Sequence, residues 1–143
     1  MGQTRDLEDG TPVRMVTLTL LADQDYLALA RTSAMHVGAL LFLPLPRVND
    51  LRLAVDEACT SFLTPARPVS ADAPPPETVE TMELSYDRYP RHLHVTIRAR
   101  APRSWPARDE LGWAMLGSLV GQVRIEVREG IGVLTLIEPL PMR

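Results

Sequence analysis

The spacing of apolar residues changes several times along this chain, and these changes limit the folds that it can adopt. In residues 13–21, "VRMVTLTLL", aliphatic and β-branched side chains partly alternate, a pattern that predicts a β-strand. Over residues 22–42 the apolar side chains instead recur at helical spacing, and Asp23 is a suitable N-cap. The first two elements are therefore predicted to be a strand and a long helix.

Prolines separate this helix from a second one. The segment 43–50, "LPLPRVND", interrupts the helical pattern, because proline lacks a backbone donor and disfavours helix at the residue before it. Asn49 or Asp50 can then cap a helix that ends near Thr64, before Pro65. One apolar stripe on this helix contains Leu51, Val55, Ala58 and Phe62. We expect the stripe to face the core.

Proline, glycine and alternation also define the rest of the chain. Five of the thirteen prolines lie in residues 65–78, which predicts an exposed, partly polyproline-like loop. Residues 78–87 and 91–101 alternate and are expected to form an antiparallel hairpin. An apolar helix is expected over 110–122, followed by a second hairpin over 123–140.

The predicted order of elements indicates the fold class. Strands that bury one face against helices form an α+β, two-layer sandwich, here a mixed, mostly antiparallel sheet covered by three helices. The second hairpin is expected to turn at Glu129 and Gly130. Residues 1–11 lack apolar periodicity and are predicted to be a flexible tail, which leaves 12–143 as a single domain.

Composition excludes several classes of function. The net charge of -3 and the absence of a basic run argue against direct binding of nucleic acid. All fifteen cationic side chains are arginine, which excludes a Schiff-base lysine and a phosphate-loop lysine. With a single cysteine, no signal-peptide pattern and no apolar run long enough to cross a bilayer, we expect a cytoplasmic protein without a membrane span or a cysteine metal site.

Residues 51–62, "LRLAVDEACTSF", place an acid, Glu57, one helical turn before the hydroxyl of Ser61. The segment "LAVDEACT" within it resembles the N-box helix of the GHKL ATPase superfamily. It is most similar to that of the anti-sigma factor serine kinases, the RsbW-like partner-switching family. The order of elements over roughly residues 13–140 resembles this family as well.

The resemblance assigns roles to Glu57 and Ser61. In these kinases the N-box glutamate is the general base, and Glu57 stands at its position. An asparagine one turn later binds the magnesium that bridges the ATP phosphates, whereas this chain has Ser61 there. A serine hydroxyl is shorter than an amide and is a weaker ligand for a hard cation.

Two further nucleotide motifs of the family are altered. The aspartate that binds adenine falls on Ala99, and the glycines that follow it fall on Ala101 and Arg103. Alanine cannot accept a hydrogen bond from adenine, and arginine would crowd a position that requires glycine. In the phosphate-binding Gly-x-Gly, Glu110 replaces the first glycine and Gly112 is retained. We therefore expect a vestigial pocket.

Other candidate residues have structural as well as functional interpretations. Cys59 is expected to pack as a small core residue. His92 and His94 face the same side of a strand, as metal ligands do, but without a third ligand we expect an exposed strand face and no metal. Trp105 and Trp113 flank the helix expected at 110–122 and are expected to pack in the core, where they can fill an empty pocket.

The predicted function is that of an anti-sigma-factor-like, partner-switching regulator that binds protein and has lost ATP binding and kinase activity. The resemblance implies a sigma factor or a STAS-domain anti-anti-sigma protein as partner, contact through Arg31, and a homodimer. Glu57 is then a vestigial base or a surface residue that supports Arg52. An active serine kinase that uses ATP and magnesium in a divergent pocket, and a scaffold that dimerises with a kinase paralogue, are the alternatives.

Overall fold

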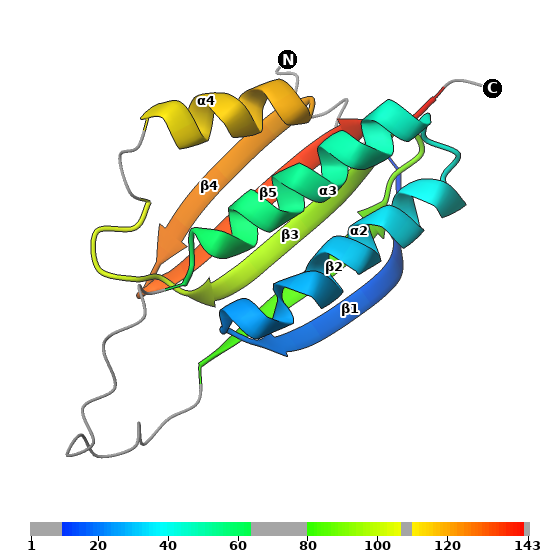
Figure 1. Ribbon diagram of the computed structural model, residues 1–143. Helices are drawn as coiled ribbons and strands as arrows, with labels where there is room; N and C mark the ends of the chain where they lie inside the picture. The colour runs from blue at the N-terminus through cyan, green and yellow to red at the C-terminus, as the bar shows by residue number, and fades with distance from the viewer. Residues whose placement is uncertain (1–9, 64–79, 107–109, 142–143) are drawn as a thin grey trace.

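The computed structural model describes residues 10–63, 80–106 and 110–141. Its helices lie together on one face of a sheet (Figure 1). The helical elements are the 3-10 turn η1 (Gln24–Tyr26), α2 (Leu27–Leu40), α3 (Leu45–Thr60) and α4 (Glu110–Leu119). The strands are β1 (Val13–Leu21), β2 (Thr81–Arg88), β3 (His92–Arg100), β4 (Gln122–Arg128) and β5 (Ile131–Pro139). The predicted α+β sandwich and its order of elements are confirmed.

The sheet has the order β1-β2-β3-β5-β4, and each neighbouring pair is antiparallel. It is therefore antiparallel throughout its described strands rather than mixed. Two antiparallel helices, α2 and α3, connect β1 to β2 and return the chain to the end of the sheet where β1 finishes (Figure 1). The next strand must consequently run in the opposite direction to β1.

Both predicted hairpins are present. The turn between β4 and β5 contains Glu129 and Gly130, with φ of 53° and 80°. Two successive residues with positive φ are the requirement of a type I′ turn, whose twist matches that of the flanking strands. Residues 1–9 of the predicted tail lie outside the described residues. The whole proline-rich segment 65–78 lies outside them as well.

The predicted helix boundaries need two corrections. Asp23 caps the 3-10 turn η1 by accepting from the N–H of Asp25 at 2.8 Å, and α2 begins only at Leu27. Helix α3 begins at Leu45, so Asn49 and Asp50 lie within the helix instead of capping it. A proline in the first helical turn removes no intrahelical hydrogen bond, which is why the segment expected to break the helix forms its start.

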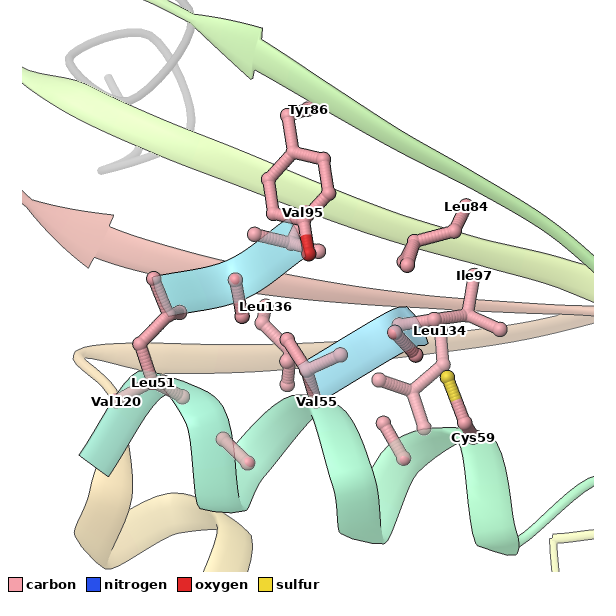
Figure 2. Packing of buried hydrophobic residues seen from close by; sticks show 14 of the residues in the cluster. Leu51, Val55, Cys59, Leu84, Tyr86, Val95, Ile97, Val120, Leu134 and Leu136 are labelled. Carbon is pink, nitrogen blue, oxygen red and sulfur yellow. The ribbon is translucent and has the colours of Figure 1, made fainter. Parts of the chain in front are cut away.

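Helix α3 is the centre of the core. Leu51 and Val55 point from it toward the sheet, and Cys59 lies one turn further along (Figure 2). The sheet side chains that face this helix are Leu84, Tyr86, Val95, Ile97, Leu134 and Leu136. Cys59 is buried, as predicted, and burial raises the pKa of its thiol to about 12. The stripe predicted from sequence is therefore the main contact between the two layers.

A buried carboxylate joins α3 to the last strand. Glu138 on β5 is 1% exposed and accepts a hydrogen bond from the guanidinium of Arg47, in the first turn of α3. Its second oxygen, Oε2, has no hydrogen-bond partner in the structure. Burial raises the pKa of this carboxyl above its ordinary value of 4.5, although the hydrogen bond and the charge of Arg47 oppose the shift.

This raised pKa predicts a pH dependence of stability. Because the pKa of Glu138 is higher in the folded state, folding favours the protonated carboxyl. The resulting stabilisation of the folded state is present in full below the unfolded pKa, and it is lost as pH rises through the folded pKa. Glu138→Gln keeps a neutral side chain at all pH values. We expect the free energy of unfolding of this variant, relative to the original chain, to rise in urea titrations as pH increases above the ordinary carboxyl value of 4.5.

The matched control is Glu126→Gln, which changes an exposed carboxylate that pairs with Arg128 on the same strand at 3.0 Å. Its difference from the original chain should stay small and nearly constant with pH. A Glu138→Gln difference that is equally constant would contradict the prediction.

Candidate functional site

Ser61 and Trp105 form the centre of the candidate site. Ser61 immediately follows α3, and its hydroxyl donates to the backbone oxygen of Ala58 at 2.7 Å. The same hydroxyl accepts a hydrogen bond from Nε1 of Trp105 at 3.1 Å. The Ser61 hydroxyl therefore uses its one proton and one of its two acceptor positions within the protein itself.

The indole of Trp105 is packed on both sides. Its ring stacks on Phe62 with a centroid distance of 4.6 Å and an interplanar angle of 23°. Gly132 of β5 lies so close that an added Cβ would be 2.7 Å from the Phe62 ring and 2.8 Å from the Trp105 ring. Trp105 is thus a core residue, as predicted, and Gly132 is required for its close approach to the sheet.

The predicted adenine motif lies beside this cluster. Ala99 is buried on β3 and pairs in register with Gly132, which places it next to the aromatic pair. Ala101 follows the strand, is half-buried, and donates its backbone N–H to Gly130 at 2.8 Å. Arg103 is exposed in the turn that precedes Trp105. Ser61 and Ala99 therefore lie beside the same aromatic cluster, whereas the side chain of Arg103 is exposed to solvent.

The predicted phosphate motif is on α4. Gly112 is half-buried in the first turn of the helix, and no described contact joins it to Ser61. The backbone of Glu110 begins the helix, but its side chain lies outside the described part of the chain. Trp113, on the same turn, is half-buried and packs against the core, as predicted.

Glu57 is half-buried on α3, one turn before Ser61. No hydrogen bond or ion pair joins its carboxylate to another residue that the structure describes, so the expected support of Arg52 is not found. The neighbouring acid on α3, Asp56, does form an ion pair. Its Oδ1 accepts from Nη1 of Arg31 at 2.8 Å.

This ion pair positions Arg31 on the outer side of the helical layer. The Arg31 side chain is 37% exposed, so it is bound to α3 and accessible to solvent at the same time. The same helix also has three large apolar side chains that are exposed. Leu29, Met35 and Leu40 are 54%, 43% and 50% exposed. An arginine amid exposed apolar groups is a composition typical of protein interfaces.

The two histidines lie on the same face of β3, as expected, but this face is not exposed at His94. Its ring is 6% exposed and lies against Tyr89, with centroids 4.2 Å apart. The aromatic side chain from the turn that follows β2 covers it, which the strand pattern alone does not reveal. Among the described residues, no group of three metal-ligating side chains forms a site.

The residues at these positions do not fit a magnesium nucleotide. Mg²⁺ requires oxygen ligands held toward the phosphates. The Ser61 hydroxyl is held toward Trp105 instead, and the buried Ala99 has no side-chain acceptor for adenine. No chemical step through bound nucleotide therefore follows from this geometry.

Sequence reasoning missed the hydrogen bond from Trp105 to Ser61 and the role of Gly132. Two signals point to them in retrospect. Trp105 is the only large apolar residue in the polar stretch 102–106, and such an isolated aromatic is usually buried. Gly132 interrupts a run of aliphatic strand residues, which indicates close approach of another group.

The hydrogen bond between Ser61 and Trp105 can be tested by mutation. Ser61→Ala leaves the buried indole N–H without an acceptor, which should lower the free energy of unfolding by about 1–3 kcal/mol. Chemical denaturation followed by tryptophan fluorescence measures this change. The control is Thr60→Ala, because that exposed hydroxyl contacts only Asp56 O within its own helix, and its change should stay within about 0.5 kcal/mol. Equal effects of both substitutions would disprove the inferred role of Ser61.

Comparison with known proteins gives three results. No family model matches the chain. The anti-sigma-F factor RsbW of Mycobacterium tuberculosis, in both the H37Rv and the CDC 1551 strain, is 35% identical over 115 residues. That match covers 78% of this chain and 61% of the relative, so the chain spans less than two thirds of the relative's length.

The structural comparison agrees with the sequence match. A crystal structure of the RsbU and RsbW domains of a Mycobacterium tuberculosis protein superimposes with a TM-score of 0.62, covering 94% of this chain and 34% of that one. The two sequences are 17% identical, so this likeness shows the fold alone. The sequence match and the shared fold both involve RsbW proteins, so this chain is similar to the RsbW-like family in sequence and in fold.

Proposed function

We propose that this chain is an anti-sigma-type, partner-switching regulator that acts by binding protein and has no nucleotide chemistry. The proposed loss of nucleotide chemistry is supported by the hydrogen bond from Trp105 to Ser61. Ser61 stands at the position where the family binds magnesium. A metal ion that took the place of the indole N–H at the Ser61 hydroxyl would have to move the aromatic pair. That movement would break the stacking of Trp105 on Phe62 and its packing on Gly132.

The proposed binding partner is a sigma factor or a STAS-domain antagonist. Its support is the name of the relatives, which are anti-sigma-F factors, together with the outer face of α2. This helix has Arg31 and the exposed side chains Leu29, Met35 and Leu40, of which Met35 lies one turn from Arg31. An arginine held by Asp56 loses little side-chain entropy on binding, which favours it as an interface contact. A homodimer, as the family implies, is part of the proposal.

None of the helices within the described ranges has both the length and the apolar character of a membrane span. The exposed apolar side chains of α2 are proposed to contact protein. One observation favours the alternative of an active kinase: Glu57 has no described partner and is half-buried at the position of the family's general base. A direct test of nucleotide binding separates the two functions.

Nucleotide binding is tested by calorimetry of the full chain with ATP and magnesium. We expect no saturable heat at ATP concentrations up to about 1 mM, which corresponds to a binding free energy weaker than about -4 kcal/mol. Micromolar binding would disprove the proposed loss of nucleotide chemistry. Phosphorylation of a STAS-domain protein by the original chain, but not by Glu57→Gln, would establish the kinase instead.

Protein binding is tested with purified F-class sigma factors and STAS-domain proteins from the same genome. Arg31→Ala should weaken the complex at least about tenfold in titrations, as expected for an arginine within an interface. Asp56→Asn is the matched control, because it removes the ion pair while leaving Arg31 in place. Its effect should be smaller, since an exposed pair contributes up to about 1 kcal/mol.

Equal weakening by the two substitutions would show that Arg31 acts only through its ion pair with Asp56. Binding that neither substitution changes would remove Arg31 from the interface. If no sigma factor or STAS-domain protein binds, and only a kinase paralogue does, the chain is the scaffold of the third hypothesis. The mass of each sample by light scattering shows whether the chain is a homodimer.

A further inference from the structure

A groove of about 660 Å³ lies at the end of the sheet where α2 finishes, away from Ser61 and Trp105. We call it the terminal groove. The end of α2 contributes Leu40 and Phe42, the turn between β2 and β3 contributes Pro90 and Arg91, and the segment after β5 contributes Leu140. Its walls thus come from three segments that are distant in sequence.

The terminal groove combines basic and apolar side chains. Arg88 and Arg91 line it, both are exposed, and no described carboxylate pairs with either. In contrast, Arg98 and Arg100, at the other end of β3, pair with Glu83 and Glu80. Among the residues that the structure describes, no acidic side chain lines the groove. The chemistry that it fits is an acidic segment with an apolar side chain.

The apolar part of the groove is unusually exposed. Leu40 is 50% exposed and Phe42 is 68% exposed. Phe42 follows the C-terminus of α2 with a φ of 58°, a left-handed conformation that non-glycine residues rarely adopt. Most of the Phe42 side chain is therefore at the surface, where a further apolar group can cover it.

The polypeptide reaches the rim of the groove at Gly10. An added Cβ at this glycine would be 2.8 Å from Cγ of Pro90, which lines the groove, and its φ is 91°. Only glycine combines this backbone conformation with such close contact. Gly10 consequently lies at the rim of the terminal groove.

The segment 1–9, "MGQTRDLED", matches the groove in charge. It has three carboxylates, Asp6, Glu8 and Asp9, against one arginine, and Leu7 lies among the acids. A tether at Gly10 gives such a segment an effective concentration in the millimolar range, which favours even a weak contact. We propose that residues 1–9 bind in the terminal groove of their own chain, with the carboxylates at Arg88 and Arg91 and Leu7 against Phe42.

This contact has a regulatory consequence that does not depend on the proposed function. The bound segment covers Leu40 and Phe42, at one end of the exposed apolar face of α2. Any protein that binds this end of α2 must displace the segment. Residues 1–9 therefore act as an intramolecular competitor, whose strength falls as salt concentration rises.

The proposal is tested by nuclear magnetic resonance on the full chain with a nitroxide at Gln3→Cys. Cys59 is buried and its thiol pKa is about 12, so the introduced cysteine is the reactive one. We expect selective broadening of the amides of Phe42, Arg91 and Leu140. Neutralising the three acids (Asp6→Asn, Glu8→Gln and Asp9→Asn) should lower the docked-to-free ratio about tenfold, since each exposed pair contributes a factor of up to about five.

Arginine variants provide the matched controls. Arg88→Gln with Arg91→Gln should remove the broadening as the acid variants do, and Arg98→Gln with Arg100→Gln should leave it unchanged. Broadening that is absent at the groove, uniform over the surface, or unaffected by neutralising the acids would disprove the proposal. Broadening that appears only between a spin-labelled copy and a separate isotope-labelled copy would identify a second chain as the occupant.

Discussion

The burial of α3 is the constraint on which the rest of the structure depends. Leu51, Ala54, Val55 and Ala58 have no exposed surface, and they hold this helix between α2, α4 and the sheet. Alanines on the stripe let the neighbouring elements approach closely, and leucine and valine fill the space above the sheet. Because this stripe fixes the rotation of α3, it also fixes the directions of its polar side chains.

Most of the fold could be predicted from the sequence because each element has a local signal. The alternation in 91–101 and the Glu129–Gly130 turn depend only on neighbouring residues, and the structure confirms both. The start of α3 could not be predicted in the same way. Asn49 is a good N-cap by type, but tertiary packing extends the helix to Leu45, and a proline in the first turn permits this extension.

The candidate site was only partly predictable, for a physical reason. Ser61 and Ala99 could be located because the chain resembles a family around them, and the structure brings them to one cluster through Gly132. The contact of Trp105 with Ser61 spans 44 residues and involves a segment without periodicity. Its geometry depends on packing in three dimensions, so no local pattern in the sequence contains it.

The polar side chains of α3 act in two separate places. Asp56 faces α2 and holds Arg31 at the surface, whereas Ser61, beyond the end of the helix, contacts the aromatic pair beside the sheet. A change at one place therefore leaves the contacts of the other intact. In the proposed function, Trp105 and Phe62 occupy the position of the nucleotide, and their packing leaves the outer face of α2 unaltered. This separation would allow a domain of this fold to keep a protein-binding surface after its ligand position has become part of the core.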